Sequence, residues 1–449
     1  MIVKRANQLL KYLVASCILA IPLYSKFPFI VVPGTFVAIR IEDFLLAITA
    51  VVWLLSIKDE LKAFVSDIFT RTIVLYLFVG FVSLLSAIYV TKSVDPLVGL
   101  LHAFRRVEYF IPFFAGRQVI KYQRNALTYY IVLFFVVIGV SFIYGLGQRY
   151  LSWPIIITQN QEYSKGVALR WVEGSHINAT FAGHYDLASF LVLVLPFVVT
   201  SYFALKKKMT KMSISIIFFA GLWLMANAVS RISIFSYLVS LVLALIFIKK
   251  YRYIIPTVVL SVLVFSMSST VIVRYTRIYD VVVSEVAKLT YVVKPAYALE
   301  STPPPDPRIE DQQPSPLPED RSSSIRFNVE WPRALRALSK NPFIGTGFSS
   351  ITLATDNDYL RALGETGVLG FVSFGLVFVY LIVNYLKAFP LKRFDILEQS
   401  FLAGSFAALA GIFIIAVFID IFEASKFVTL FWFIQGMAVA LIEQNKVKV

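Results

Sequence analysis

Cysteine and histidine are scarce in this chain of 449 residues, which has one cysteine and three histidines. A single thiol, Cys17, can form neither an internal disulfide framework nor a thiolate metal cage. Charged residues make up only 15% of the sequence, against 58% for hydrophobic residues. This balance excludes a water-soluble globule, so the net charge of +15 does not indicate a nucleic-acid partner. The sequence also lacks a Gly-rich phosphate-binding loop, and no nucleotide or redox cofactor is expected.

Extended apolar runs take up most of the sequence. A helix needs about 20 mainly apolar residues to cross ~30 Å of hydrocarbon, and twelve runs come close to that length. They lie at residues 9–24, 42–57, 72–90, 96–116, 126–146, 186–205, 213–229, 232–248, 253–273, 367–386, 399–419 and 427–443. The second run is short and the fourth contains charges, so eleven spans are an alternative. No small-residue cleavage site follows the first run, which is expected to be a retained span. The sequence therefore predicts an all-α polytopic membrane protein with about 12 transmembrane helices.

Lysine and arginine are distributed unevenly over the connectors between these runs. If both termini face the cytoplasm, seven short segments on that side carry 21 positive residues. They are Lys4, Arg5, Lys11, Lys58, Lys62, Arg71, Arg117, Lys121, Arg124, Lys206, Lys207, Lys208, Lys211, Lys249, Lys250, Arg252, Lys387, Lys392, Arg393, Lys446 and Lys448. Because cytoplasmic connectors are enriched in Lys and Arg, this pattern predicts cytoplasmic termini and an extracytoplasmic segment between runs nine and ten. A kinase or nucleotide-sugar transferase is disfavoured there, because cytosolic nucleotide does not reach that side.

This orientation can be tested by cysteine labelling. We expect a cysteine placed at Ser315, in a background without Cys17, to react with a membrane-impermeant thiol reagent added to intact cells. The reason is that Ser315 lies in the long segment between runs nine and ten. Labelling seen only after permeabilisation would show that the orientation is inverted.

The chain divides into three parts. Residues 1–273 hold runs one to nine, residues 274–366 form one large extracytoplasmic loop, and residues 367–449 hold the last three runs and a cytoplasmic tail. Within the loop, apolar spacing over 274–299 predicts an amphipathic helix that lies on the bilayer or against the membrane domain. Seven prolines then make residues 302–320 an extended tether, in which no chemistry is expected.

The last part of the loop, residues 322–341, is predicted to be helical. An apolar stripe recurs at helical spacing, formed by Phe327, Trp331, Leu335 and Leu338. Arg326, Glu330 and Arg333 fall on a different face, and Pro332 should kink the helix or begin a second one. A charged helix face is ordinarily solvated, but above a membrane domain it also suits the binding of phosphate or glycan.

Several charged residues fall inside the apolar runs or at their ends, where a charge is costly and usually faces a cavity or another charge. Arg231 begins the eighth run directly after Ser230, and Arg105, Arg106 and Glu108 interrupt the fourth. A structural pairing of either arginine with Glu108 is the alternative to a binding role. Arginine suits a pyrophosphate because its planar fork donates two charge-assisted hydrogen bonds and stays protonated.

The connector before the sixth run carries further polar side chains on the predicted outer side. It contains His176, His184 and Asp186. A zinc site is disfavoured because the spacing of the histidines matches no zinc ligand set. His184 is therefore expected to contact substrate or to have a structural role.

Arginines suited to a pyrophosphate and acidic residues on the same outer side would together suit one reaction, the transfer of a glycan from a pyrophosphate. Displacing pyrophosphate from an anomeric carbon needs stabilisation of the leaving group and benefits from a base beside the acceptor hydroxyl. Asp356 is the first candidate for the base, and the alternatives are Asp358, Glu365 and Asp186. Asp356 or Asn357 could instead cap the following helix, and both roles could coexist.

These motifs follow one another in a specific order along the chain. Ser230-Arg231 comes first, then a large external loop with Arg326, Trp331, Asn341-Pro342 and Gly345-Thr346-Gly347, then Asp356-Asn357 and Gly367-Val368-Leu369-Gly370. This order resembles the O-antigen ligase and polymerase superfamily, and residues 180–186 are similar to the family's segment before the sixth span. The likeness in topology covers nearly the whole chain, whereas the motifs cover 170–186, 230–231 and 326–370.

The resemblance implies a membrane glycosyltransferase of the bacterial or archaeal cytoplasmic membrane, with its active site facing outside. Such an enzyme takes a glycan from an undecaprenyl-pyrophosphate carrier and transfers it to an acceptor hydroxyl. The resemblance implies that Arg231 and Arg326 hold the pyrophosphate, with Arg105 or Arg106 assisting. The further candidates for substrate binding are Arg333, His184 and Asn357. Implied partners are the carrier-linked oligosaccharide, membrane lipid, and a chain-length regulator or other envelope-assembly proteins, with no nucleic acid.

Asp356 distinguishes between branches of the family. Ligases that attach O-antigen to lipid A core place a histidine at this position, whereas an acidic residue is common in polymerases. The sequence therefore favours a polymerase, with a ligase to a protein or lipid acceptor as the close alternative. A flippase for lipid-linked oligosaccharide is another class, but the paired broken segments of inverted-repeat transporters are not evident.

Overall fold

The computed structural model describes residues 2–25, 27, 29–31, 38–156, 168–172, 175–267, 325–352 and 354–446. Its longer helices are α1 (Ile2–Leu23), α2 (Ile41–Ser56), α3 (Leu61–Ser66), α4 (Ile68–Tyr89), α5 (Pro96–Tyr122), α6 (Ala126–Tyr150), α7 (His184–Ala204), α8 (Lys208–Ala228), α9 (Arg231–Phe247), α10 (Ile254–Ser266), α13 (Trp331–Lys340), α14 (Asp358–Ala388), α15 (Ile396–Ile415) and α16 (Ser425–Lys446). Single turns are η1 (Lys58–Glu60), η3 (Tyr251–Tyr253), η4 (Arg326–Glu330), η5 (Leu391–Arg393) and η6 (Ile421–Glu423). Two antiparallel ladders pair β1 (Ile30–Val31) with β2 (Ala38–Ile39), and β3 (Ile155–Ile156) with β4 (Ala168–Leu169).

Each of the twelve apolar runs lies in a helix, although the end of the ninth falls outside the described residues. Within the described part of the chain, 8 helices are long and apolar enough to cross a membrane, namely α1, α4, α6, α7, α8, α14, α15 and α16. Helices α9 and α10 are apolar but shorter, α2 has 16 residues, and α5 carries Arg105, Arg106 and Glu108. The prediction of a helical, polytopic membrane protein is confirmed, whereas the number of spans stays a prediction.

Local signals in the sequence explain where several of these helices begin. The carboxylate of Asp67 accepts the backbone N–H of Thr70 at 3.1 Å and caps α4. Asp95 caps α5 in the same way, by accepting the N–H of Leu97 at 3.0 Å, and Pro96 occupies the first helical position. Caps of this kind satisfy backbone donors that a helix leaves free at its start.

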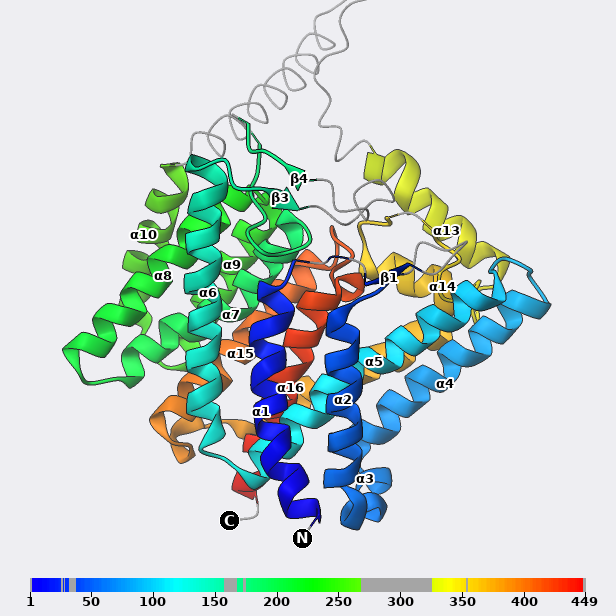
Figure 1. Cartoon of the computed structure of the whole chain (residues 1–449), viewed down its shortest axis with the longest axis horizontal. Coiled ribbons are helices and arrows are strands. Elements are labelled where there is room, and N and C mark those ends of the chain that lie inside the picture. Colours follow the sequence, from blue (N-terminus) through cyan, green and yellow to red (C-terminus); the bar gives the residue numbers. More distant parts are fainter. Residues whose placement is uncertain are drawn as a thin grey trace, which may run out of the picture.

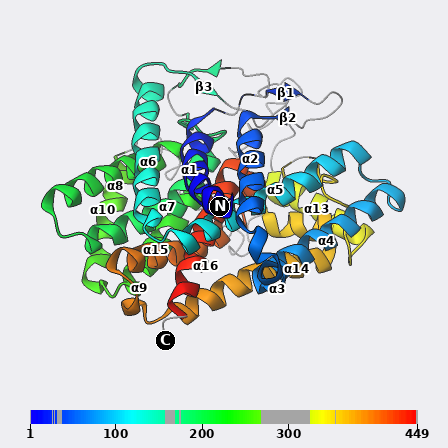
Figure 2. The same cartoon turned by 60° about the horizontal axis from the view of Figure 1, so that its bottom comes forward.

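The helices form two groups joined by α16. One group contains α6, α7, α8, α9, α10 and α15, and the other contains α2, α4, α5, α13 and α14, with α1 and α16 between them (Figure 2). Helix α16 packs closely against α5 because Gly436 has no side chain, and a Cβ there would collide with the backbone of Phe113. The apolar stretch of α16 is buried throughout. This helix therefore holds the two groups together.

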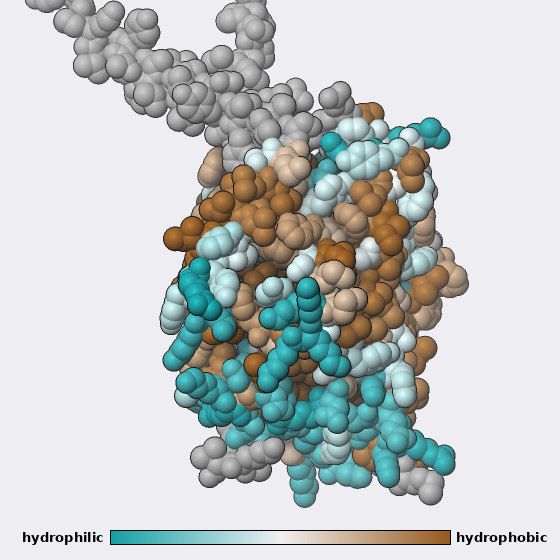
Figure 3. Space-filling view, turned by 90° about the vertical axis from the view of Figure 1, so that its left-hand side faces the viewer, coloured by the Kyte–Doolittle hydropathy of each residue, from teal (hydrophilic) through white to brown (hydrophobic). Residues whose placement is uncertain are grey.

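The surface agrees with a protein that is surrounded by lipid. Hydrophobic residues cover much of the upper and middle part of one side, and hydrophilic residues gather at the lower end (Figure 3). Both termini lie at that lower end of the bundle, whereas β1, β3, β4 and α13 lie toward the opposite end (Figure 1). Large apolar side chains on α4 and α5 are exposed, among them Phe78 at 62% and Phe104 at 62%. Such exposure would be costly in water and is expected against hydrocarbon.

The structure refines the predicted boundaries around the long loop. The predicted helix 322–341 is described from residue 325, where a π-helical turn, η4, leads into α13, and Pro332 is near the start of α13. Helix α14 begins at Asp358, earlier than the apolar run, and it is interrupted at Gly367 with φ 65°. The amphipathic helix predicted over 274–299 and the tether 302–320 lie outside the described residues.

Candidate functional site

The turn before α14 holds Asp356 in a left-handed conformation, with φ 48°. Asn357 is the N-cap of α14, because its Oδ1 accepts the backbone N–H of Leu360 at 2.9 Å. The capping alternative for Asp356 is therefore wrong, since its neighbour performs that role. A non-glycine residue with positive φ is uncommon and costs strain that surrounding contacts must offset. The side chain of Asp356 is therefore not used as a helix cap and is available for another contact.

Asp420 is the residue that shapes this turn. Its two carboxylate oxygens accept the backbone N–H groups of Thr355 at 2.7 Å and Asn357 at 3.0 Å. The same carboxylate accepts Nη2 of Arg361 at 3.0 Å and Nε at 3.2 Å. One partly buried acid thereby ties the start of α14 to the segment between α15 and α16.

Asp358 has a comparable structural role. Its carboxylate accepts the backbone N–H of Ile421 at 2.9 Å and that of Phe422 at 3.3 Å. These bonds close the single turn η6 onto α14. Because both oxygens are used in this way, Asp358 is a poor candidate for the base.

Arg326, the first residue of η4, and Asp356 lie next to each other, although α13 and the segment after it separate them along the chain. Nη2 and Nε of Arg326 donate to Oδ2 of Asp356 at 2.8 Å and 3.0 Å. The side chain of Arg326 is 12% exposed and that of Asp356 is 25% exposed. Tyr185, in the first turn of α7, is close enough to Arg326 to contribute to the raised pKa of this guanidinium. The structure thus joins a cation and a carboxylate that the sequence analysis had assigned to separate roles.

The surroundings of Asp356 favour a proton acceptor. Burial raises the pKa of the Asp356 carboxyl above its ordinary value, and the negative charge of Asp420 adds to this, although Arg326 opposes the shift. Burial and the charge of Asp356 raise the pKa of Glu330 to about 7. A group whose pKa lies near the working pH is suited to proton transfer. Two carboxyl groups beside Arg326 thus have environments typical of acid–base groups.

Glu365, an alternative base, lies in a different cluster. Its Oε1 accepts Nη1 of Arg361 at 3.2 Å, and its Oε2 lies 3.8 Å from Nη2 of Arg106. Arg106 also pairs with Glu423. Burial alone would raise the pKa of Glu423, but Arg106 and Arg361 outweigh it and lower this pKa to about 2. Glu365 is 2% exposed, so this cluster is a buried network of charges rather than an accessible site.

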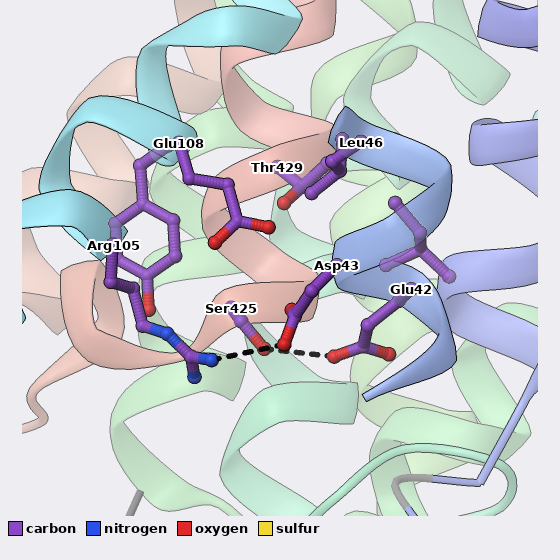
Figure 4. Close-up of a pocket in the computed structure, with 9 residues that line it drawn as sticks. Glu42, Asp43, Leu46, Arg105, Glu108, Ser425 and Thr429 are labelled. Carbon is purple, nitrogen blue, oxygen red and sulfur yellow. Dashed lines mark hydrogen bonds and ion pairs between the residues drawn. The ribbon is translucent and has the colours of Figure 1, made fainter. Parts of the chain in front are cut away.

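Arg105 points into another small cavity, which is drawn in Figure 4. Its Nη2 donates to Asp43 Oδ2 at 3.2 Å and to the carbonyl oxygen of Ala38 at 3.4 Å. Glu42 faces the same cavity and accepts the hydroxyl of Ser425 at 3.3 Å. In the described residues, neither Arg105 nor Arg106 forms an ion pair with Glu108, so the alternative of a structural pairing within α5 is wrong. The two arginines bind carboxylates on other segments instead.

The remaining predicted residues lie on three helices, α7, α9 and α13. His184 and Asp186 lie in the first turn of α7, with the rings of His176 and His184 only 3.7 Å apart, and Asp186 is buried. Since Tyr185 contacts Arg326, this turn adjoins the Arg326–Asp356 pair. Arg231 is the first residue of α9. Arg333 lies on α13, and its buried Nη1 has no hydrogen-bond partner among the described residues.

Sequence reasoning missed several residues that organise this end of the molecule. Asp420 and Glu423 follow an apolar run and gave no motif, and Tyr185 was overlooked beside two histidines. Lys426 is fully buried in α16, where its Nζ donates to the carbonyl oxygens of Tyr24 at 2.5 Å and Thr180 at 2.7 Å. A lysine at the start of the last apolar run was the available signal, because charge at such a position usually has a partner.

Comparison with known proteins bears on this arrangement. Residues 216–375 match the family model described as O-Antigen ligase, and no curated protein matches the chain. The matched range contains Arg231, Arg326 and Asp356. The match confirms the resemblance to the O-antigen ligase and polymerase superfamily, and it supports a membrane enzyme that transfers glycans.

Proposed function

We propose that this protein is a glycan polymerase that uses an undecaprenyl-pyrophosphate-linked donor outside the cytoplasmic membrane. The observation that carries the proposal is the contact between Arg326 and Asp356. The contact supports the proposal because a cation suited to the leaving group and a carboxylate suited to the acceptor lie together within the range that matches the family.

The reaction follows from these two groups. The acceptor hydroxyl attacks the anomeric carbon of the donor, and its proton passes to Asp356. The bond from the anomeric carbon to the phosphate oxygen breaks, and the pyrophosphate carrier leaves with the electron pair. Arg326 stabilises the negative charge that develops on this leaving group. When Arg326 turns to the pyrophosphate, its hold on Asp356 weakens and the carboxylate becomes a better base.

Arg231 and Arg333 are proposed to assist in holding the donor. His184, at the start of α7, and Asn357, beside Asp356, are proposed as further contacts. Asp186 and Glu365 are less favoured as bases, because Asp186 is buried within α7 and Glu365 belongs to the Arg106–Arg361 network. We place Asp356 first among the three candidates.

A reconstituted assay tests the function. Purified protein in lipid nanodiscs would receive a carrier-linked oligosaccharide as the only glycan, and products would be separated by length. We expect a ladder that grows by one repeat unit at a time. A single addition to a protein or to a lipid without carrier would favour the ligase, and translocation without a new glycosidic bond would favour the flippase.

Donor affinity is expected to depend on pH through Glu330. Its pKa of about 7 means that this carboxyl is neutral below pH 7 and negative above it. A negative charge beside Arg326 repels a pyrophosphate, so lowering the pH from 8 to 6 should tighten donor binding about tenfold. Binding is measured rather than turnover, because protonation of Asp356 also slows the reaction.

The Glu330→Gln variant is the control for this dependence. It should bind the donor at pH 8 as tightly as the wild type does at pH 6, with little further change on acidification. The same pH profile in wild type and variant would assign the titration to another group.

A further inference from the structure

A cationic cavity, separate from the Arg326–Asp356 pair, lies between the start of α2, the outer half of α5 and the segment before α14. It has a volume of ≈ 200 Å³. We call it the arginine cavity, and its polar lining residues are Arg40, His102, Arg105, Ser349, Thr352 and Arg361. Neither Arg326 nor Asp356 lines it.

The side chains that line this cavity carry positive charge. Three arginines line it, and no carboxylate is among its lining residues. The balancing acids are Asp43 at 3.2 Å from Arg105, Asp420 at 3.0 Å from Arg361 and Glu42 at 3.8 Å from Arg40. These acids hold the arginines in position, and none of them lines the cavity. The arrangement suits an anion with more than one negative charge.

Unsatisfied polar atoms indicate that a ligand belongs here. Nε of Arg40 and Oγ of Ser349 are both buried, and neither has a hydrogen-bond partner in the described part of the chain. Among the described residues, Arg105 donates through Nη2 to Asp43 and to Ala38. Buried polar groups are almost always hydrogen-bonded, so the two unpartnered atoms of Arg40 and Ser349 point to a ligand with acceptor oxygens. Arg361, whose donors go to Asp420, Glu365 and Ile351, contributes its charge.

The ligand is expected to be part of a lipid. Val98, Leu101 and Ile351 give the cavity an apolar side. On the same helix, α5, the side chains of Leu97, Leu100 and Phe104 are exposed at 51%, 42% and 62%. A tail could follow this lipid-facing strip of α5 while its head group enters the cavity. A cavity of ≈ 200 Å³ is smaller than the sites of drug-sized ligands, so it suits a compact head group rather than a glycan.

The cavity lacks the two groups that we assign to the reaction, because neither Arg326 nor Asp356 lines it. Its lining contains no carboxylate, and His102 is its lining residue with a basic imidazole. It is connected to the reacting side through Arg361, because Asp420 binds both this guanidinium and the backbone of the turn that carries Asp356. These features describe a holding site next to a reaction centre.

We propose that the arginine cavity binds the pyrophosphate of a second isoprenoid carrier, the one that bears the acceptor glycan. The proposal rests on the proposed function, because a polymerase joins two carrier-linked glycans, whereas a ligase to protein needs only one carrier. Occupation of both sites would therefore separate polymerase from ligase.

Binding stoichiometry tests the cavity without any turnover. Protein in nanodiscs of zwitterionic lipid would be titrated with radiolabelled undecaprenyl pyrophosphate. We expect two molecules bound per chain in the wild type and one in Arg40→Ala. Arg105→Lys, which keeps the charge but loses the planar fork, should weaken the second site at least tenfold. The matched control is Arg336→Ala, an exposed arginine on α13, which should still bind two.

Competition in the same nanodiscs shows whether the cavity binds the isoprenoid carrier, a bulk anionic lipid or free pyrophosphate. If phosphatidylglycerol displaces the second carrier molecule at equal concentration, the cavity is a site for bulk anionic lipid and the proposal is overturned. Displacement by inorganic pyrophosphate at equal concentration would likewise overturn the role of the isoprenoid tail. One molecule bound in the wild type would also overturn it.

An activity measurement then assigns the acceptor. In Arg40→Ala, the rate with a carrier-linked acceptor relative to that with a soluble glycoside acceptor should fall at least tenfold. An unchanged ratio would overturn the acceptor role. Absence of transfer by the wild type to either acceptor would instead refute the proposed function, while the stoichiometry would still decide whether the cavity binds the carrier.

Discussion

Replacing Asp356 by asparagine should lower the rate of glycan transfer by ~10²–10⁴ and leave donor binding nearly intact. Asparagine has the size of aspartate, and its amide oxygen can still accept a hydrogen bond from Arg326, which now reaches Oδ2 at 2.8 Å. It cannot take a proton from an acceptor hydroxyl. The helix cap is untouched, because Asn357 performs that role. The rate is measured with saturating donor and acceptor in nanodiscs.

Two measurements make this result specific to the base. The variant should be produced and folded at wild-type levels, and labelled donor should bind with an affinity within a few-fold of the wild type. Full activity of a folded Asp356→Asn protein would exclude the base role. The assignment would then move to Glu330, Glu365 or Asp186, or the arginines alone would have to activate the leaving group.

Removal of Arg326 is the second change with a large expected effect. Arg326→Ala should lower kcat by ~10²–10³, the usual cost of losing one group that stabilises charge in a transition state. It should also weaken donor binding, because the pyrophosphate loses its charge-assisted hydrogen bonds. Both quantities can be obtained from single-turnover rates over a range of donor concentrations.

Two further variants show whether the guanidinium itself is responsible. Arg326→Lys keeps a positive charge near Asp356 but cannot form two parallel bonds, and it should restore only part of the activity. Arg336→Ala removes an exposed charge from α13 and should have little effect, as expected for a solvated side chain. Equal, small losses in Arg326→Ala and Arg336→Ala would leave the proposed anion site without support.

Much of this site was visible in the sequence as separate parts. A helical face suggested that Arg326 binds phosphate or glycan, and the family resemblance assigned it to pyrophosphate. Asp356 was assigned to proton transfer from its place before an apolar run. Their contact was not foreseen, because 30 residues separate them. The partners of Arg105 and Arg106 were not visible in the sequence for the same reason. The nearby Glu108 was the alternative to a binding role, whereas the structure pairs these arginines with Asp43 and Glu423, 62 and 317 residues away.

The sequence by itself determined the membrane class, the positions of the helices and the family resemblance. These properties depend on the length of apolar runs, on capping residues and on the order of motifs, all of which are local or one-dimensional. Only the tertiary structure decided which acid faces which arginine, that Asn357 rather than Asp356 caps α14, and that Arg40, Arg105 and Arg361 share a cavity. Ion pairs and cavities form where distant segments meet, and the strength of a charge interaction depends on the distance and burial reached there.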